Sequence, residues 1–193
     1  MPLVRGFKAE AERRASALWG DLGLAMTTPF NLDAAAALFG ARIVMGDSLI
    51  PRSRLEQLED LQAYAFSACT FEVREQPVIV LNPLRSQGRQ HADCAHELSH
   101  ILLRHQMRVP ERIGDLVFFT GNADQEDEAG WMAGALLLPR QAVLRAAHAG
   151  MNPAAIAEFY QTTEEMARFR INATGAAIQA RRGRQPAGSP ASS

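Results

Sequence analysis

The sequence predicts a fold that combines many helices with a small β-sheet. Apolar residues recur at helical spacing in several segments, beginning with residues 6–22. Two runs rich in β-forming residues, Ala68–Val73 and Val78–Leu81, are separated by four residues and predict a hairpin. Hydrophobic residues make up 47% and charged residues 21% of the 193, which is enough apolar surface for a folded domain with a small appendage.

Short elements are predicted after the first helix and before the hairpin. The pattern indicates a helix over 32–39, with Asn31 as its N-cap and Gly40 just past its end. Residues 41–45 then alternate like a strand, and residues 53–63 have the spacing of a helix. Within the hairpin we expect the second strand to be more buried, because it is almost wholly apolar.

The second half of the chain is predicted to be mainly helical. Ser86 is the expected cap of a long helix over about 88–105, and a helix over 123–138 ends where Pro139 prevents its continuation. Between them we expect a loop that contains Pro110, Gly114 and Gly121. Two further helices follow: Asn152-Pro153 begins one that reaches Phe159, and the capping box Thr162-x-x-Glu165 begins another that ends near Gly175.

Charge and cysteine content exclude several classes of protein. The formal net charge is −1, so no global field attracts the chain to nucleic acid or to an anionic membrane. Two cysteines are too few for a disulfide scaffold. Charges occur throughout residues 1–22, which rules out the apolar core of a signal peptide, and no run approaches the length of a membrane span. We therefore expect a cytoplasmic protein that does not bind membranes.

The segment His96-Glu97-Leu98-Ser99-His100 predicts a zinc site. Two histidines four residues apart on a helix lie about 40° apart around its axis and about 6 Å apart along it, so both rings can reach one metal ion. Glu97 is placed to reach a water molecule rather than the metal, as a catalytic base would be. The flanking residues are mostly apolar, and a metal ion removes the cost of burying polar side chains among them.

A third ligand is required, and the neighbouring histidines do not supply it. His105 is five residues past His100, about 140° around a continuous helix, and is therefore expected to point elsewhere. His91 fails by the same geometry, and His148 lies far downstream. Cys94 is about 200° from His96 around the helix and is expected to pack in the core.

The acidic start of the 123–138 helix offers the remaining candidates, Glu126 and Glu128. Residues on the face of Glu126, Ala129 and Ala133 among them, are small and allow another helix to approach closely. The face of Glu128 carries Trp131 instead, which would hold a neighbouring helix away. Helical phase therefore favours Glu126 as the third ligand, with Glu128 as the alternative.

These motifs resemble the ImmA/IrrE metallo-endopeptidases of bacteria and their mobile elements. The resemblance covers roughly residues 30–175. Its matching segments are Val78-Ile-Val-Leu-Asn82, Arg89-Gln90, Ala95-His-Glu-Leu-Ser-His-Ile-Leu-Leu103, Glu126-x-x-Ala129-x-x-Met132-Ala133 and Leu136-Leu-Leu-Pro139. The family usually has glycine at the position of Ser99 and phenylalanine at that of Met132; both changes keep the size or the apolar character.

The resemblance implies an α+β, zincin-like fold, with a small antiparallel sheet packed against the motif helix and a glutamate of the following helix as third zinc ligand. It also implies a zinc-dependent endopeptidase that cleaves a helix-turn-helix transcriptional repressor and so releases stress or mobile-element genes. In this chain the implied ligands of Zn²⁺ are His96, His100 and Glu126, and the implied catalytic residue is Glu97.

The C-terminal helices leave a second function open. Residues 152–175 have the outline of a helix-turn-helix, and seven arginines against three acidic residues between 140 and 184 would suit contacts with DNA phosphates. Packing of the pair on the rest of the chain is favoured, because few base-reading side chains stand on the second helix. The alternative functions are a non-catalytic zinc-containing regulator and a toxin–antitoxin component, acting by binding DNA or protein.

These predictions divide the chain into an N-terminal helical segment (1–30), a zinc metallopeptidase domain (31–148), a helix-turn-helix-like extension (149–180) and a disordered tail (181–193).

Overall fold

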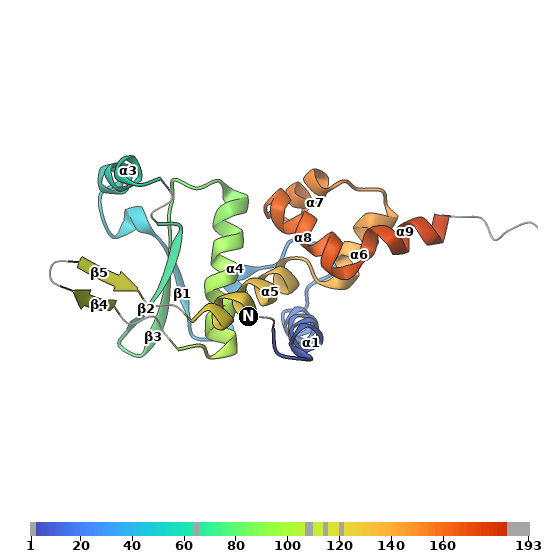
Figure 1. The fold of residues 1–193 in the computed structure, drawn as a ribbon, viewed down its shortest axis with the longest axis horizontal. Helices are drawn as coiled ribbons and strands as arrows, with labels where there is room; N and C mark the ends of the chain where they lie inside the picture. The colour runs from blue at the N-terminus through green and yellow to red at the C-terminus, as the bar shows by residue number, and fades with distance from the viewer. Residues whose placement is uncertain (1–2, 64–65, 107–109, 114–115, 120–121, 185–193) are drawn as a thin grey trace, which may run out of the picture.

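The computed structural model describes residues 3–63, 66–106, 110–113, 116–119 and 122–184. The elements in chain order are α1 (Phe7–Asp21), α2 (Leu32–Leu38), β1 (Arg42–Met45), the 3-10 helix η1 (Gly46–Ser48), α3 (Arg52–Leu61), β2 (Ala68–Val73), β3 (Gln76–Leu81), α4 (Gln87–Leu103), β4 (Pro110–Ile113), β5 (Leu116–Phe119), α5 (Ala123–Leu137), α6 (Arg140–His148), α7 (Pro153–Phe159), α8 (Glu164–Thr174) and α9 (Ala176–Arg184). The fold is α+β, with the strands on one side of α4 and helices α6–α9 on the other (Figure 1). Within the described residues, no helix combines the length and the apolar composition needed to cross a bilayer.

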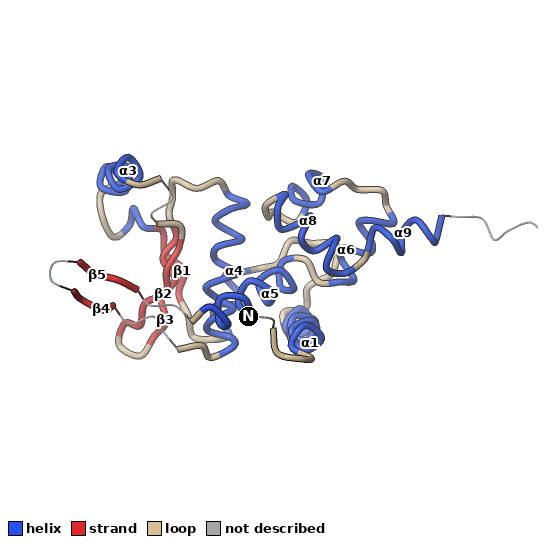
Figure 2. The backbone as a smooth tube through the Cα atoms, in the orientation of Figure 1, coloured by secondary structure: helices blue, strands red, loops and turns tan. Residues whose placement is uncertain are grey.

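The main sheet has the strand order β1-β3-β2 (Figure 2). Strands β2 and β3 pair antiparallel, which confirms the predicted hairpin. Strand β1, however, pairs parallel with β3, so the sheet is mixed and the expectation of an antiparallel sheet is wrong. The long connection through α3 and β2 allows the chain to return in the parallel direction. As the central strand, β3 is more buried than β2, as predicted, and β2 forms an edge of the sheet.

The hairpin turn is tighter than the sequence predicted. Strand β3 begins at Gln76, which leaves Arg74 and Glu75 as the two linking residues, with φ of 52° and 65°. Positive φ at both central residues is the geometry of a type I′ turn, whose twist matches that of the paired strands.

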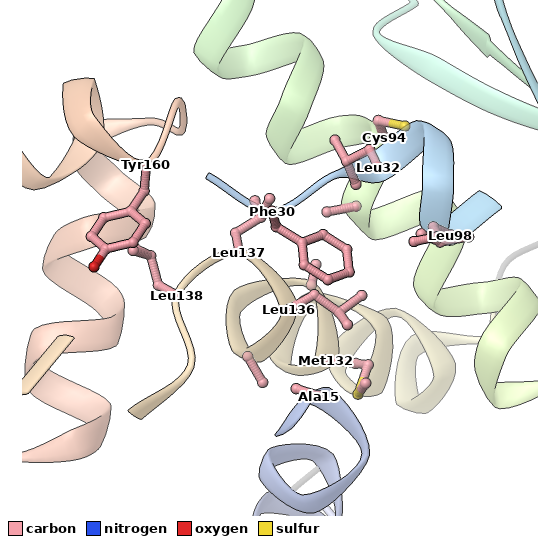
Figure 3. Close-up of a cluster of buried hydrophobic side chains, with 14 of the residues drawn as sticks. Ala15, Phe30, Leu32, Cys94, Leu98, Met132, Leu136, Leu137, Leu138 and Tyr160 are labelled. Carbon is pink, nitrogen blue, oxygen red and sulfur yellow. The ribbon is translucent and has the colours of Figure 1, made fainter. Parts of the chain in front are cut away.

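The hydrophobic core is built around α5. One cluster of buried side chains includes residues from α1 through to the start of α9. Ala15 of α1 lies beside Met132 of α5, while Phe30 lies against the next turn of α5 at Leu136 (Figure 3). Leu98 of α4 belongs to the same cluster, so α5 is covered by α1 on one side and by α4 on another.

Side chains from distant elements satisfy the C-terminal carbonyl groups of α5. The indole N–H of Trp19 donates to the Leu136 carbonyl at 2.8 Å, and Nε of Arg170 donates to the Leu138 carbonyl at 2.8 Å. The last carbonyls of a helix have no partner within it, so these two bonds fix where α5 ends. Arg170 is fully buried and also forms an ion pair with Glu12 of α1.

Asparagine side chains begin several of the predicted helices. The Oδ1 atoms of Asn31, Asn122 and Asn152 accept backbone N–H groups in the first turns of α2, α5 and α7. These bonds replace intrahelical partners that a first turn lacks. The predicted helices at these positions are confirmed, as are α1, α3 and the strand β1. Ser86 stands at the N-cap position of α4, but its side chain does not cap the helix.

The predicted capping box of α8 is displaced by one residue. Thr163, not Thr162, is the N-cap, and its hydroxyl accepts the Met166 N–H at 3.1 Å. The backbone of Thr162 instead lies against the first turn of α4 at Gly88. The end of α8 at Gly175, with φ of 65°, agrees with the sequence.

Two strands and two helices lie where the sequence analysis predicted no regular element. Instead of a loop, β4 and β5 form an antiparallel hairpin, and β-forming residues dominate the sequence of β5, Leu116–Phe119. Helix α6 begins directly after Pro139, whose missing N–H is no loss at a helix start, where backbone N–H groups have no intrahelical partner. Helix α9 continues to Arg184, so residues 181–184 do not belong to a disordered tail; arginine favours helix, and Ala176 and Ala180 anchor this one. Residues 185–193 of the predicted tail lie outside the described residues.

We predict that Gly88→Ala destabilises the fold. A Cβ atom at this position would lie 2.5 Å from the Thr162 carbonyl oxygen, so backbone has to move. The free energy of unfolding, measured with urea, should fall by about 1–3 kcal/mol. The matched control is Gly20→Ala in the last turn of α1, where an added Cβ meets nothing within 4 Å. It should stabilise the protein by up to about 1 kcal/mol. Equal effects of the two substitutions would contradict the close approach at Gly88.

Candidate metal centre

His96 and His100 lie one turn apart on α4, on the side that faces α5. Their ring centroids are 4.8 Å apart, as helical spacing requires. Ala95 and Leu98 of the same helix are fully buried, which anchors α4 in the core and fixes the direction of the two histidines. The regular helix thus places both rings from local geometry alone.

A carboxylate from α5 meets these two rings. The Nε2 atoms of His96 and His100 are 3.1 Å apart, and Oε2 of Glu126 lies 3.1 Å from Nε2 of His96. Oε1 of Glu126 lies 3.7 Å from Nε2 of His100. Two ligand atoms on a tetrahedral Zn²⁺ ion, each bonded at about 2.0–2.2 Å, are about 3.3–3.5 Å apart. The three side chains therefore have the donor types and the spacing that fit such an ion.

Of the two candidate glutamates, the structure brings Glu126 to the histidines. It lies in the first turn of α5, and Ala129 and Ala133 on the same face are buried. Glu128 points to another partner: its Oε2 lies 3.1 Å from Nε2 of His105. Among the described residues, His96, His100 and Glu126 form the group whose ligand atoms all lie within 4.8 Å of one another.

His105 does not point away from the site, and that expectation is corrected. Its Nδ1 atom lies 3.0 Å from Nδ1 of His100. The expectation assumed a continuous helix, but α4 ends at Leu103 and Arg104 adopts the left-handed conformation with φ of 56° and ψ of 40°. This single residue reverses the chain and returns His105 to the ring of His100. A positive φ at an arginine leaves no clear signal in a sequence.

Glu97 is held by the edge strand of the sheet. The hydroxyl of Thr70 on β2 donates to Oε2 of Glu97 at 2.6 Å. This contact joins the motif helix to the hairpin and restricts the carboxylate to one orientation. Glu97 was predicted from its motif, whereas Thr70 was not, because its contact with Glu97 depends on how β2 packs against α4.

Cys94 and the two positions that depart from the family pattern lie in the core. Cys94 lies in the cluster of buried side chains (Figure 3). Burial raises the pKa of its thiol to about 12, which makes the metal-binding thiolate scarce. Ser99 is fully buried and donates to the Ala95 carbonyl at 2.7 Å, so its hydroxyl is satisfied within α4. Met132 is fully buried as well. None of the three side chains competes for the metal position.

A cavity of about 640 Å³ opens beside His96 and Glu126. Side chains of α8 form one of its walls, including Met166 and Phe169. The ring of Phe169 packs edge-on against Trp131 of α5 at 5.3 Å between centroids. The C-terminal helix pair thus borders the candidate metal centre.

Two arginines of α8 form ion pairs within the chain. Arg170 is buried and pairs with Glu12, and Arg168 pairs with Glu164 one turn earlier. Burial lowers the pKa of Arg170, and the Glu12 carboxylate opposes that shift. These pairs reduce the charge that α8 offers to a phosphate backbone and agree with packing of the helix pair on the rest of the chain.

A family model supports the resemblance noted from the sequence. The model described as the IrrE N-terminal-like domain, a peptidase family, matches residues 57–172. This chain belongs to that family. The match contains α4 and α5, and therefore all of the residues that converge at the candidate metal centre.

Comparison with solved structures supports the fold. A transcriptional regulator of Mycobacterium tuberculosis superposes with a TM-score of 0.51 and 18% sequence identity. The similarity covers 88% of this family member and 48% of the regulator, so the chain spans about half of that protein. No curated protein matches the sequence.

We predict that adding Zn²⁺ to the metal-free protein raises its Tm, because an ion that binds only the folded state stabilises it. The free energy of unfolding should rise by about 2.7 kcal/mol when free Zn²⁺ is present at a hundredfold excess over its Kd. Glu126→Ala should lose most of this shift, because it removes one of three ligands. In Glu128→Ala the three ligands remain, so a shift should persist. If Glu126→Ala kept the full shift, Glu126 would not be a ligand.

Proposed function

We propose that this chain is a zinc-dependent metallo-endopeptidase with a zincin-like arrangement, in which His96, His100 and Glu126 hold the metal. The observation that carries this proposal is the convergence of three ligand atoms, with a further acid, Glu97, adjacent to His96 on the same helix and not among the three. Structural zinc sites usually have four protein ligands, whereas catalytic sites have three and an open position. The three-residue set among the described residues favours the catalytic type.

The chemistry follows from the role of each group. A Zn²⁺ ion held at this site would supply Lewis acidity, which lowers the pKa of a water molecule and polarises a peptide carbonyl. Glu97 takes a proton from the water whose oxygen adds to the carbonyl carbon, and it delivers that proton to the amine nitrogen as the C–N bond breaks. The hydrogen bond from Thr70 keeps the Glu97 carboxylate in one orientation for both transfers.

Two neighbouring features would accommodate a polypeptide. The cavity beside His96 and Glu126 has the size of a site for one or a few side chains. Strand β2 is an edge of the main sheet and carries Thr70, so an extended substrate could pair with it close to Glu97. The substrate would then lie between the edge strand and the cavity.

For the substrate we propose a helix-turn-helix transcriptional repressor. Membership of the IrrE N-terminal-like family supports this choice, as the resemblance found from the sequence implies it. The protein of similar fold from Mycobacterium tuberculosis is named as a transcriptional regulator, which agrees with a role in gene control. A non-catalytic regulator or a toxin–antitoxin component acting through DNA is less well supported, because Arg168 and Arg170 are engaged within the chain.

The direct test is cleavage of a helix-turn-helix repressor encoded beside this gene. We expect cleavage with Zn²⁺ and none after chelation, read by gel electrophoresis and mass spectrometry. Glu97→Gln should lower the rate by about 10²–10⁴-fold, because it removes general acid–base catalysis, and should keep the metal. Equal cleavage by Glu97→Gln, or an intact repressor with the zinc-loaded protein, would favour the binding-module alternative.

Pairing of the substrate with β2 predicts a dependence on one backbone N–H. Successive residues of a strand direct their N–H groups to opposite sides, so Phe71→Pro and Glu72→Pro differ in which side they affect. The variant that loses an N–H on the open edge should have a kcat/KM about tenfold lower, the cost of one lost hydrogen bond, and an unchanged Tm. The variant that loses an N–H bonded to β3 should have a lower Tm. Unchanged cleavage by a stably folded edge variant would mean that the substrate does not pair with β2.

A further inference from the structure

We propose that His105 and Glu128 are positioning residues for His100, and that together these three side chains form a histidine relay behind the metal position. This inference rests on the proposed function only in taking His100 as a metal ligand. It assigns a role to two side chains that lie outside the candidate ligand set. Glu128, the alternative third ligand from the sequence, would then act through His105.

The three side chains form a continuous hydrogen-bonded chain. Nδ1 of His100 lies 3.0 Å from Nδ1 of His105, and Nε2 of His105 lies 3.1 Å from Oε2 of Glu128. Both distances are those of hydrogen bonds. The rings of His100 and His105 meet edge-on, with centroids 5.0 Å apart and an interplanar angle of 71°. Each ring nitrogen of His105 thus has one partner.

One arrangement of protons satisfies every atom of the histidine relay. Nε2 of His100 faces His96 and Glu126, and a nitrogen that binds a metal offers its lone pair and carries no proton. The proton of the neutral ring then sits on Nδ1, which donates to Nδ1 of His105. His105 consequently carries its own proton on Nε2 and donates it to the Glu128 carboxylate.

The histidine relay is largely shielded from water, so an unsatisfied polar atom in it would be costly. The side chain of His105 is 5% exposed, that of His100 16% and that of Glu128 23%. A buried ring nitrogen without a partner is costly, so the relay selects one tautomer and one orientation for His100. The negative charge of Glu128, passed through His105, also makes His100 a stronger donor to a cation.

The fold supplies this contact through the end of α4. The left-handed conformation of Arg104 turns His105 back towards His100, and the second turn of α5 brings Glu128 to the other ring nitrogen of His105. Glu126, the candidate ligand, and Glu128, the partner of His105, are thus two residues apart on α5 and lie on different faces of the helix. Packing of α4 on α5 places the two pairs together.

The test measures metal affinity rather than cleavage. Zn²⁺ affinity is determined by competition with a chromophoric chelator, and the visible spectrum of the Co²⁺-loaded protein reports the geometry at the metal. His105→Ala should bind Zn²⁺ about 10–100-fold more weakly than the unaltered protein, with a changed Co²⁺ spectrum. His105→Asn should recover part of the affinity, because its amide oxygen can accept the Nδ1 proton of His100.

A charge-matched control separates the relay from simple electrostatics. Glu128→Gln and Asp127→Asn each remove one negative charge from the same turn of α5, and Glu128 is the residue whose carboxylate lies 3.1 Å from Nε2 of His105. We expect the first to weaken Zn²⁺ binding clearly more than the second. Circular dichroism and Tm of the metal-free variants verify that each one folds.

The outcomes distinguish this inference from the proposed function. Unchanged Zn²⁺ affinity and Co²⁺ spectrum in folded His105→Ala would overturn the relay, as would equal effects of Glu128→Gln and Asp127→Asn. A protein that binds Zn²⁺ and responds to these substitutions, yet cleaves no repressor, would overturn the proposed function and support the relay. A protein that binds no Zn²⁺ would overturn both.

Discussion

The close packing of α4 on α5 is the constraint on which the candidate metal centre depends. Two of the converging side chains come from the first helix and one from the second, so their spacing is set by the distance between the helix axes. Ala95 of α4 and Ala129 and Ala133 of α5 are buried, and small side chains allow a short interaxial distance. The ends of α5 are fixed as well, by the Asn122 cap at its start and by the hydrogen bond from Trp19 at its C-terminal carbonyl groups.

The site also depends on where the regularity of α4 stops. As long as the helix continues, residues recur on one face at fixed intervals, which is how His96 and His100 come to face the same point. Arg104 ends that regularity, and the residue after it occupies a position that no helical wheel would assign. The regular repeat of α4 therefore places the two candidate ligands His96 and His100, and the end of the same helix places His105 behind them.

Much of this arrangement could be predicted from local patterns. Helical spacing, asparagine caps and the apolar second strand gave the elements around the site, and helical phase gave Glu126 in preference to Glu128. What failed was non-local or depended on one backbone angle. The parallel pairing of β1 with β3 has no sequence signature, because it is decided by packing of segments more than 30 residues apart. The position of His105 depended on one φ value, and the contact of Thr70 with Glu97 depended on docking of the hairpin on α4.

The buried ion pair of Arg170 with Glu12 has a consequence for how much of the chain forms one folding unit. The family model begins at residue 57, yet Glu12 belongs to α1 and Trp19 of the same helix reaches the end of α5. Trimming the protein to the matched region would remove both the carboxylate that pairs with Arg170 and the helix that packs against α5. Breaking a buried pair by removing one partner costs about 3–5 kcal/mol. That loss is comparable with the entire stability of many small domains. The smallest segment that folds on its own therefore begins well before residue 57, and α1 is part of the same folding unit as the family segment.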